Sequence, residues 1–520
     1  MKNTYSKLLF ISLFISNNLI AQNLENLLDD ANEYVKSNNL NIEYQPSSLT
    51  ILYGKDLEAL GIRTLQEALD FVPGVQTMDE TTNFSRISFR GVVKPYDIIN
   101  EQIRFYVNGL DVYYNYFSNF PINLIERVEI TRGGISLASG ERGFLGSINV
   151  VTKADNRDGS GINLGLGSFN EKNGAVFFNE NINNWKLGID SYYLKNDKKI
   201  PAPSANLLNY NISKSALDRK KESLEGVEER AFGVNLKNDN WTFDMRYLES
   251  LSQNHYGFLG YLDFNEDGYS KYTTLTSQVM YKNHISENNK IKSRIGYSNN
   301  NVKLNTYLYK FEPNLPGLYN PHYQIDYSTQ DIFGEVSIIN SSLENHQIVY
   351  GIIVLDSKVT KNDYSTNADY IAKVGLYEPF LDAYLPISKE LTTLSGNEGY
   401  INNEQRQTNY SYYIQDTFSY SENLNLLFNT KIDDSQNAGK LINYTLSGIY
   451  SSDNTNIYKA TFSKNYRIPS RRENYIVGHI FVFGDESLKA EKSNTLELSY
   501  NYINDNEIFK VNSYYSIYED

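Results

Sequence analysis

The acidic segment Asp263-Phe264-Asn265-Glu266-Asp267-Gly268 has residue types and spacing that could bind a divalent cation. Asp263, Asn265 and Asp267 fit the D-x-N-x-D-G pattern with which a calcium-binding loop begins. The twelfth position is Thr274, where a full loop has a bidentate glutamate. Asp, Asn and Gly are also ordinary turn residues. The pattern therefore predicts either Ca²⁺ bound by these three residues or an acidic hairpin turn.

A second candidate site is aromatic and consists of Tyr113, Tyr114, Tyr116 and Phe117. Aromatic rings can stack on flat ligands such as catecholate or haem rings, and tyrosine hydroxyls can form hydrogen bonds. The cluster follows a predicted strand, so we expect it in a loop that a ligand can reach. The alternative is packing against neighbouring protein, since the chain contains 44 Tyr in all.

The rest of the composition argues against an enzyme and against a nucleic-acid-binding protein. The chain has no Cys and five His, and no Ser, His and Asp pattern of a catalytic triad is found. The lack of Cys excludes disulfides and thiolate metal sites. A net charge of −14 is the opposite of the basic surface that nucleic acid requires.

The N-terminus has the features of an exported protein. Residues 1–21 are predicted to be a signal peptide, with a lysine-containing start, a short apolar core over 8–15 and Ala21 before the cleavage point. Residues 22–48 are predicted to form a periplasmic segment, in which leucines at helical spacing indicate an amphipathic helix over 23–37.

Residues 49–155 predict a compact α+β domain of short elements. A strand over 49–53 precedes a helix expected to begin at Leu57, and a second amphipathic turn stops at Pro73, which has no N–H to continue a helix. Asn108-Gly109 predicts a tight hairpin because both residues tolerate positive φ. Further strands are expected over 85–89, 104–107, 128–131 and 147–152.

Residues 160–520 alternate with a period of two, which is typical of a transmembrane β-barrel. Trp241, Phe243 and Met245 alternate with polar neighbours, so one set can contact lipid and the other the lumen. Short Asn-rich turns are expected at 181–184, 238–240, 286–290, 343–346, 421–425, 453–456 and 504–507, with mostly longer loops between them. The hairpin pattern gives about 15 strands.

Five motifs in residues 60–153 resemble the plug domain of TonB-dependent outer-membrane receptors. They are LGIRTLQEALDFVPGVQ, ISFRGV, IRFYVNGLDVY, INLIERVEITRGG and GSINVVTK, in the family's order and spacing. The stretch over 465–500 partly resembles an outer-loop motif of the same receptors. The sequence departs from the family pattern at Gly133-Gly134, where the family usually has Gly-Pro, and at SGERGFLGS.

The resemblance implies a mostly β fold: an antiparallel transmembrane barrel in the outer membrane with the N-terminal α+β plug inside its lumen. Such plugged barrels have about 22 strands, so about seven would be missing at the C-terminal end of this sequence. A smaller barrel of about 14 strands is the alternative, although it would leave the strand over 508–515 unpaired.

The resemblance also implies a latch between plug and barrel. Arg90 and Arg132 stand where the family places plug arginines that face barrel carboxylates, and Glu497 is the candidate partner. Buried arginines need such partners, because an unpaired buried charge is costly. The alternative is that both arginines cap turns at a solvated lumen. His479 stands where haem-importing members carry a ligand histidine, although residues 1–254 contain no second His.

The function that follows is ligand-gated import of a scarce metal chelate, a ferric siderophore in the first place, with haem and cobalamin as alternatives. The expected partners are the TonB–ExbB–ExbD energy-coupling complex, the chelate and outer-membrane lipid. No cofactor is expected apart from the candidate Ca²⁺. The competing class is an adhesin or phage-docking barrel that transports nothing, which would need no movable plug.

Overall fold

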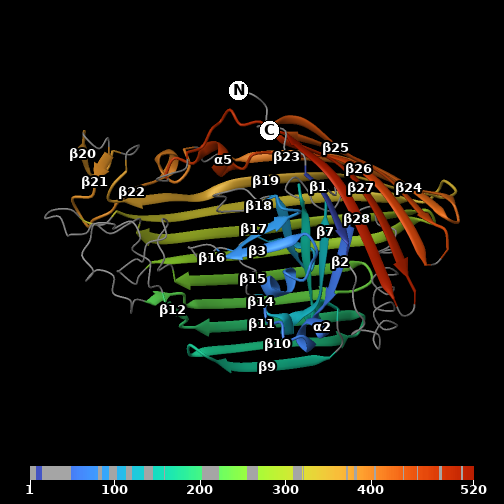
Figure 1. Ribbon diagram of the computed structural model, residues 1–520, viewed down its shortest axis with the longest axis horizontal. Helices are drawn as coiled ribbons and strands as arrows, with labels where there is room; N and C mark the ends of the chain where they lie inside the picture. Colours follow the sequence, from blue (N-terminus) through green and yellow to red (C-terminus); the bar gives the residue numbers. More distant parts are fainter. Residues whose placement is uncertain are drawn as a thin grey trace.

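The computed structural model covers the plug and a wall of long strands (Figure 1). The described residues are 8–13, 48–79, 85–92, 102–112, 120–133, 144–156, 159–201, 222–253, 268–307, 319, 321–369, 373–379, 383–402, 406–436, 438–453, 455–478, 483–504 and 507–519.

The plug is built on a five-stranded sheet in the order β2-β7-β8-β5-β6. Its strands are β2 (Ser48–Tyr53), β5 (Ile103–Val107), β6 (Leu110–Val112), β7 (Ile125–Arg132) and β8 (Gly146–Thr152). Only the β5–β8 pair is parallel among the described pairings of this sheet. At the hairpin between β5 and β6, Asn108 and Gly109 have φ values of 52° and 76°, which confirms the predicted tight turn.

Short helices and one hairpin cover this sheet. They are α2 (Gly54–Ala59), α3 (Leu65–Leu69), the 3₁₀ turn η3 (Ile122–Leu124), α4 (Lys153–Asn156) and the hairpin of β3 (Val75–Asp79) and β4 (Ser85–Phe89). The helix that was expected to begin at Leu57 begins three residues earlier, because α2 starts at Gly54, directly after β2. A Cβ there would lie 1.9 Å from the carbonyl oxygen of Ile125, so the glycine permits close packing of α2 on β7.

The plug core is apolar and continuous with the barrel wall. Val107, Leu124 and Ile130 are fully buried, and burying each such side chain stabilises the fold by about 1.5–3 kcal/mol. Tyr192 and Tyr272 of the wall belong to the same hydrophobic cluster. The plug therefore packs directly on wall strands, and Figure 1 shows it lying within their curve.

The wall is a 17-stranded sheet among the described residues. If β1 (Leu8–Leu13) and the three-residue β22 (Thr392–Leu394) are set aside, 15 strands remain, as the hairpin pattern predicts. These are β9 (Ser160–Gly167), β10 (Glu171–Ile182), β11 (Trp185–Asn196), β14 (Val227–Lys237), β15 (Trp241–Gln253), β16 (Tyr269–Ser286), β17 (Asn289–Tyr307), β18 (His322–Asn340), β19 (His346–Thr366), β23 (Gln407–Ser421), β24 (Leu424–Ser435), β25 (Gly439–Ser451), β26 (Asn456–Arg467), β27 (Glu491–Ile503) and β28 (Ile508–Glu519).

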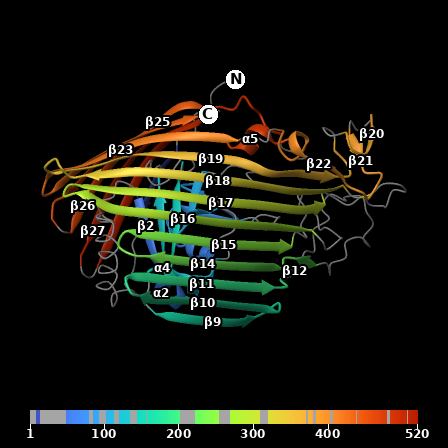
Figure 2. The ribbon, with the colours of Figure 1, turned by 180° about the vertical axis from the view of Figure 1, so that it is seen from behind.

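Neighbouring wall strands are antiparallel throughout this series, and Figure 2 shows them stacked in chain order. All seven predicted short turns join paired strands, which is confirmed by the strand bounds. The alternation is confirmed as well: Trp241, Phe243 and Met245 are exposed, whereas Asp244 and Arg246 are buried on the lumen side. The turn end is therefore periplasmic and the long-loop end extracellular.

Smaller elements lie in the outer loops or before the plug. The loop elements are β12 (Lys199–Pro201), β13 (Glu222–Leu224), β20 (Leu376–Glu378), β21 (Ala383–Leu385), η5 (Gly396–Glu398) and α5 (Arg471–Tyr475). Strand β1, in the predicted signal segment, pairs antiparallel with β28. The predicted helix over 23–37 lies outside the described residues. Among the described helices, none is long and apolar enough to cross a membrane.

Candidate functional site: the plug–barrel contacts

Arg90 lies at a sharp turn directly after β4. Its φ is +56° and that of Gly91 is +76°, and a positive φ is uncommon for a residue other than glycine. The turn is held by the Arg90 N–H, which donates to the carbonyl of Gly74 at 2.7 Å. The plug backbone therefore fixes the position from which the Arg90 side chain leaves the plug.

That side chain ends on the barrel wall. Arg90 Nη2 donates to Glu497 Oε2 at 2.5 Å, and each side chain is 8% exposed. The guanidinium also lies over the ring of Tyr514, 4.3 Å from its centroid. Glu497 on β27 and Tyr514 on β28 are directly opposite in the strand register. The structure thus places the predicted residues Arg90 and Glu497 in one buried ion pair between plug and wall.

Arg132, the other predicted latch residue, makes its hydrogen bonds inside the plug. It ends β7 and donates to Thr50 Oγ1 at 2.7 Å and to the carbonyl of Pro73. Burial and then the nearby Arg90 charge lower its pKa from 12.5 to about 10, while Glu497 acts in the opposite direction. Arg132 therefore remains protonated at neutral pH and belongs to the same charge cluster, but its described hydrogen bonds go to plug groups.

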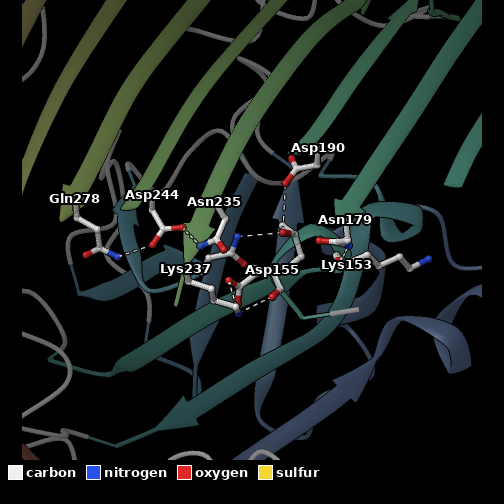
Figure 3. A network of polar contacts seen from close by, with 10 residues as sticks. Lys153, Asp155, Asn179, Asp190, Asn235, Lys237, Asp244 and Gln278 are labelled. Atoms are coloured by element: carbon white, nitrogen blue, oxygen red, sulfur yellow. Dashed lines mark hydrogen bonds and ion pairs between the residues drawn. The ribbon is translucent and has the colours of Figure 1, made fainter. Parts of the chain in front are cut away.

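A second attachment joins the end of the plug to the wall, as Figure 3 shows. Thr152, the last residue of β8, is fully buried, and its hydroxyl donates to Asp190 Oδ2 at 3.3 Å. It also accepts from Asn108 Nδ2 at 3.0 Å. The Asp190 carboxylate in turn accepts two hydrogen bonds of 2.7 Å from Arg246. The plug hairpin, the end of β8 and two wall strands are connected through this chain of contacts.

The Asp190–Arg246 pair depends on a glycine between them. Asp190, Gly233 and Arg246 are directly opposite one another on β11, β14 and β15. A Cβ at Gly233 would lie 2.3 Å from Arg246 Nη2, so any side chain there would block the arginine. The pair is almost fully buried, with 1% of the Asp190 side chain and 3% of the Arg246 side chain exposed. Its two parallel hydrogen bonds give it the geometry of a strong pair.

Helix α4 continues this attachment beyond Thr152. Asn179 Nδ2 donates to the Lys153 carbonyl at 2.9 Å, and Lys237 Nζ donates to the carbonyl and carboxylate of Asp155 at 2.6 and 3.1 Å. Figure 3 shows these contacts side by side at the base of the wall strands. The backbone of α4 is therefore held directly by wall side chains.

Close approach of α4 requires a notch in the wall at Gly188 of β11. A Cβ at this position would lie 2.0 Å from the carbonyl oxygen of Ala154. Beside the notch, Asp244 accepts hydrogen bonds from Asn235 and, at 3.2 Å, from Gln278. The wall surface under α4 is thus polar, hydrogen-bonded and shaped by a missing side chain.

At the extracellular end, two long loops are joined to each other. Ile401 and Ile476 form an isolated antiparallel bridge, and the Asn402 N–H donates to the Tyr475 carbonyl at 2.8 Å. Asn362 on β19 accepts from the Ile401 N–H at 3.0 Å and donates to its carbonyl at 2.7 Å. Tyr400, Ile401, Tyr475 and Ile476 share one hydrophobic cluster with wall tyrosines. The described parts of these two loops are therefore joined to each other and to β19 by hydrogen bonds and by shared apolar packing.

The other predicted site residues lie outside the described residues: Tyr113, Tyr114, Tyr116 and Phe117, then Asp263, Asn265 and Asp267, and His479. Their roles stay predictions. Within the described part of the chain, no group of three or more His, Asp or Glu side chains is arranged to hold a metal ion.

Sequence reasoning missed Asp190, Arg246, Gly188 and Gly233. The alternating pattern places Asp190 and Arg246 on the lumen face, but only the strand register brings them together. The motif GSINVVTK did mark the segment that carries Thr152 and Lys153.

A plug packed within an antiparallel strand wall, and tied to it by buried polar contacts, is the architecture of a plugged outer-membrane receptor. The family model for the TonB-dependent Receptor Plug Domain matches residues 41–147. The model for the TonB dependent receptor-like beta-barrel matches residues 222–520. The chain belongs to the TonB-dependent receptors of the outer membrane, a family of receptors and transporters that are not enzymes.

Individual relatives are more distant. The iron-regulated outer membrane virulence protein of Vibrio cholerae serotype O1 is 30% identical over 142 residues, which cover 26% of this chain and 21% of that protein. The vitamin B12 transporter of Vibrio vulnificus is 26% identical over 133 residues, covering 24% and 21%. The matched segment thus spans about a fifth of the length of these relatives.

Among solved structures, the siderophore receptor PiuA of Acinetobacter baumannii is similar in fold. The TM-score is 0.66 at 12% identity, and the match covers 91% of this chain and 72% of that one.

Proposed function

We propose that this receptor imports a ferric siderophore across the outer membrane. The chelate binds at the extracellular loops and the plug tip, where Tyr113, Tyr114, Tyr116 and Phe117 are the candidate contacts. Binding weakens the attachment of the plug, and the TonB–ExbB–ExbD complex supplies the energy that displaces it.

The observation that carries the proposal is the buried ion pair of Arg90 and Glu497. A barrel that only served as a docking surface would need no such contact between a separate plug and the wall. The ion pair can hold the plug against the wall while both charges are present. When one partner leaves, the other is a buried charge without compensation. Displacing the plug turn at Arg90 is therefore costly until ligand and energy coupling act together.

The choice of ligand is supported by relatives. The Vibrio cholerae relative is named for iron regulation, and PiuA is named a siderophore receptor. A cobalamin receptor is the second candidate, because the Vibrio vulnificus relative is named a vitamin B12 transporter. A haem receptor would use His479.

The test is uptake by cells that produce the receptor from its complete gene. Cells lacking their own iron receptors are given ⁵⁵Fe-labelled catecholate, hydroxamate and mixed siderophores, with labelled cobalamin and haem as separate arms. Each arm is repeated in a strain without TonB, which tests energy coupling. Each arm is also repeated with EGTA, which removes Ca²⁺ and tests the proposed site at Asp263, Asn265 and Asp267.

Uptake of one siderophore class that requires TonB supports the proposal. Uptake of cobalamin or haem alone would reassign the ligand, with His479→Ala as the check on haem. A correctly assembled receptor that imports none of them would be a docking barrel. The loss of siderophore binding in a Tyr113→Ala/Tyr114→Ala variant, but not in Tyr377→Ala in another outer loop, would support the aromatic contacts.

A further inference from the structure

A row of polar residues crosses five neighbouring wall strands under helix α4 of the plug. It consists of Asn179 on β10, Gly188 on β11, Asn235 on β14, Asp244 on β15 and Gln278 on β16. Each residue is directly opposite the next in the strand register. The row therefore lies at one level of the wall, and Figure 3 shows its amide and carboxylate side chains beside α4.

The amides of this row donate hydrogen bonds through nitrogen, but their oxygens are left over. Asn179 Nδ2 donates to the Lys153 carbonyl at 2.9 Å, and Asn235 Nδ2 and Gln278 Nε2 donate to the two oxygens of Asp244. Within the part of the chain that the structure describes, the three amide oxygens have no hydrogen-bond partner. Asn179, Asn235 and Gln278 are only 6%, 4% and 4% exposed. Because a buried acceptor without a partner is destabilising, these oxygens indicate a bound group that satisfies them.

Oxygens from plug and wall meet at the notch of Gly188. A Cβ at Gly188 would lie 2.0 Å from the Ala154 carbonyl oxygen and 3.0 Å from Asn179 Oδ1. Asn235 flanks Gly188 on the side opposite to Asn179. Its nitrogen is turned toward Asp244 on the next strand, so its oxygen lies on the side of the notch. The notch is therefore bordered by acceptor oxygens from α4 and from two wall strands.

One negative charge beside the notch has no cationic partner among the described residues. Asp244 is buried, and its two described hydrogen bonds come from neutral amides. The neighbouring charged groups are paired with one another: Arg246 donates both of its described hydrogen bonds to Asp190, and Lys237 contacts Asp155. The environment of the notch therefore favours a positively charged ligand.

A second buried wall aspartate shows how this chain compensates such a charge elsewhere. Asp433 on β24 is also buried and accepts hydrogen bonds from Ser411 at 2.6 Å and from Asn443 at 2.8 Å. Lys431 Nζ lies 2.7 Å from its carboxylate and supplies the positive charge. Asp244 has a comparable pair of hydrogen bonds but no such ammonium group in the described chain. A cation from solution could take the place of the lysine.

The ligand set indicates which cation fits. Amide and backbone carbonyl oxygens bind monovalent metal cations in channels and transporters. Calcium sites gain affinity from several carboxylates, whereas this notch has the single charge of Asp244 near it. A water molecule would satisfy at most two acceptors and would leave the Asp244 charge uncompensated. The chemistry of the notch therefore favours a monovalent cation over calcium or water.

We propose that a sodium ion binds at the Gly188 notch. Its ligands are Asn179 Oδ1, Asn235 Oδ1 and the Ala154 carbonyl oxygen, and Asp244 supplies the compensating charge behind Asn235. Because Ala154 belongs to the plug and both amides belong to the wall, the ion fastens the end of the plug to the barrel. This inference goes beyond the import of a chelate and does not depend on which ligand is transported.

The test measures how sodium affects the attachment of α4 in the complete receptor purified in detergent. Sodium is first exchanged for N-methylglucamine in the presence of EGTA, and NaCl is then titrated back at constant ionic strength. CaCl₂ without EGTA is a separate arm. The readout is hydrogen exchange of the amides in and next to α4. Crystals of the native receptor are also soaked with thallium(I), a heavy monovalent cation that anomalous scattering can locate.

The test variant is Asp244→Asn, which removes the charge at nearly constant volume. The matched control is Asp433→Asn, which removes a buried wall charge that Lys431 already compensates. A second variant, Asn179→Asp, adds a carboxylate next to the Ala154 carbonyl and should allow Ca²⁺ to replace sodium. An unchanged heat-dependent gel shift shows that the barrel of each variant is folded.

At a sodium concentration about ten times its dissociation constant, we expect exchange near α4 to be about tenfold slower than without sodium. Asp244→Asn should lose this response. Asp433→Asn should keep it, although an uncompensated Lys431 lowers the stability of that variant. Exchange that does not respond to sodium at constant ionic strength would overturn the proposal, as would an equal response in Asp244→Asn. A thallium peak found only away from the notch, or protection of native α4 by Ca²⁺ but not by sodium, would also contradict it.

Discussion

Arg90 of the plug and Glu497 of wall strand β27, which are 407 residues apart in the chain, form a single ion pair with both side chains 8% exposed. Tyr514 covers the guanidinium from the neighbouring strand. Any movement of the Arg90 turn away from β27 must uncover both charges. The pair therefore couples the position of the plug to the wall.

Replacing one member of this pair should loosen the plug more than replacing both. Arg90→Gln or Glu497→Gln leaves one buried charge without its partner, which costs about 3–5 kcal/mol. The double variant removes both members of the pair, and Arg132 keeps its hydrogen bonds to Thr50 and Pro73 of the plug, so the loss should be smaller than the sum of the single losses. The measurement is hydrogen exchange of plug amides in β4 and β7 in the purified receptor.

A surface pair in the wall provides the control. Arg230 and Glu228 on β14 also form an ion pair, but the Arg230 side chain is 54% exposed. Exposed pairs contribute about 0–1 kcal/mol, so Arg230→Gln should leave plug exchange unchanged. If the loss of plug protection in the double variant equals the sum of the losses in the Arg90→Gln and Glu497→Gln variants, the two side chains do not interact.

Replacing both Asp190 and Arg246 by apolar side chains should be tolerated better than replacing only one of them. Asp190→Asn removes the charge that compensates a buried arginine, so a loss of about 3–5 kcal/mol is expected. Asp190→Leu/Arg246→Met removes both charges at similar volume and should recover much of it. Thermal unfolding followed by circular dichroism measures both effects. An Asp190→Asn receptor as stable as the native one would contradict this.

Gly188 should be intolerant of any side chain because the plug lies against it. A Cβ would meet the Ala154 carbonyl at 2.0 Å, and such overpacking costs about 1–3 kcal/mol. Gly334 on β18 is the control, since nothing lies within 4 Å of its Cβ position. We expect Gly188→Ala to increase protease cleavage near α4 and Gly334→Ala to have no effect. Similar cleavage in both variants would show that a side chain at position 188 does not disturb the packing of α4 on the wall.

The wall could be predicted from the sequence to a large extent because its signals are local. Period-two alternation on β15 and Asn-rich turns such as 238–240 need no information from distant residues. The Asn108-Gly109 turn was equally local, since both residues take the positive φ that the turn requires. By contrast, Gly54 packs closely against the carbonyl of Ile125, a residue distant in the sequence, and no local pattern contains this contact.

The contacts between plug and wall could be predicted only where a family motif marks both partners. Arg90 and Glu497 lie in two such motifs, and the structure joins them. Asp190 and Arg246 lie in none, and they meet because β11, β14 and β15 align them on either side of Gly233. A shift of one residue in either pairing would move one of these side chains to the lipid face.

The periplasmic turn between β25 and β26 should weaken at low pH through Asp453. Its carboxylate accepts hydrogen bonds from the Thr455 N–H at 2.8 Å and the Asn456 N–H at 2.6 Å. Hydrogen bonds from Thr455, followed by those from Asn456, lower the pKa of Asp453 from 3.8 to about 2. Because the pKa is lower in the folded state, this stabilisation is complete above about pH 4 and is lost as the pH falls through about 2. The urea midpoint of the native barrel should therefore exceed that of Asp453→Ala at pH 7, and the difference should shrink between pH 4 and 2. A difference that stays constant over this range would show that the carboxylate charge does not hold the turn.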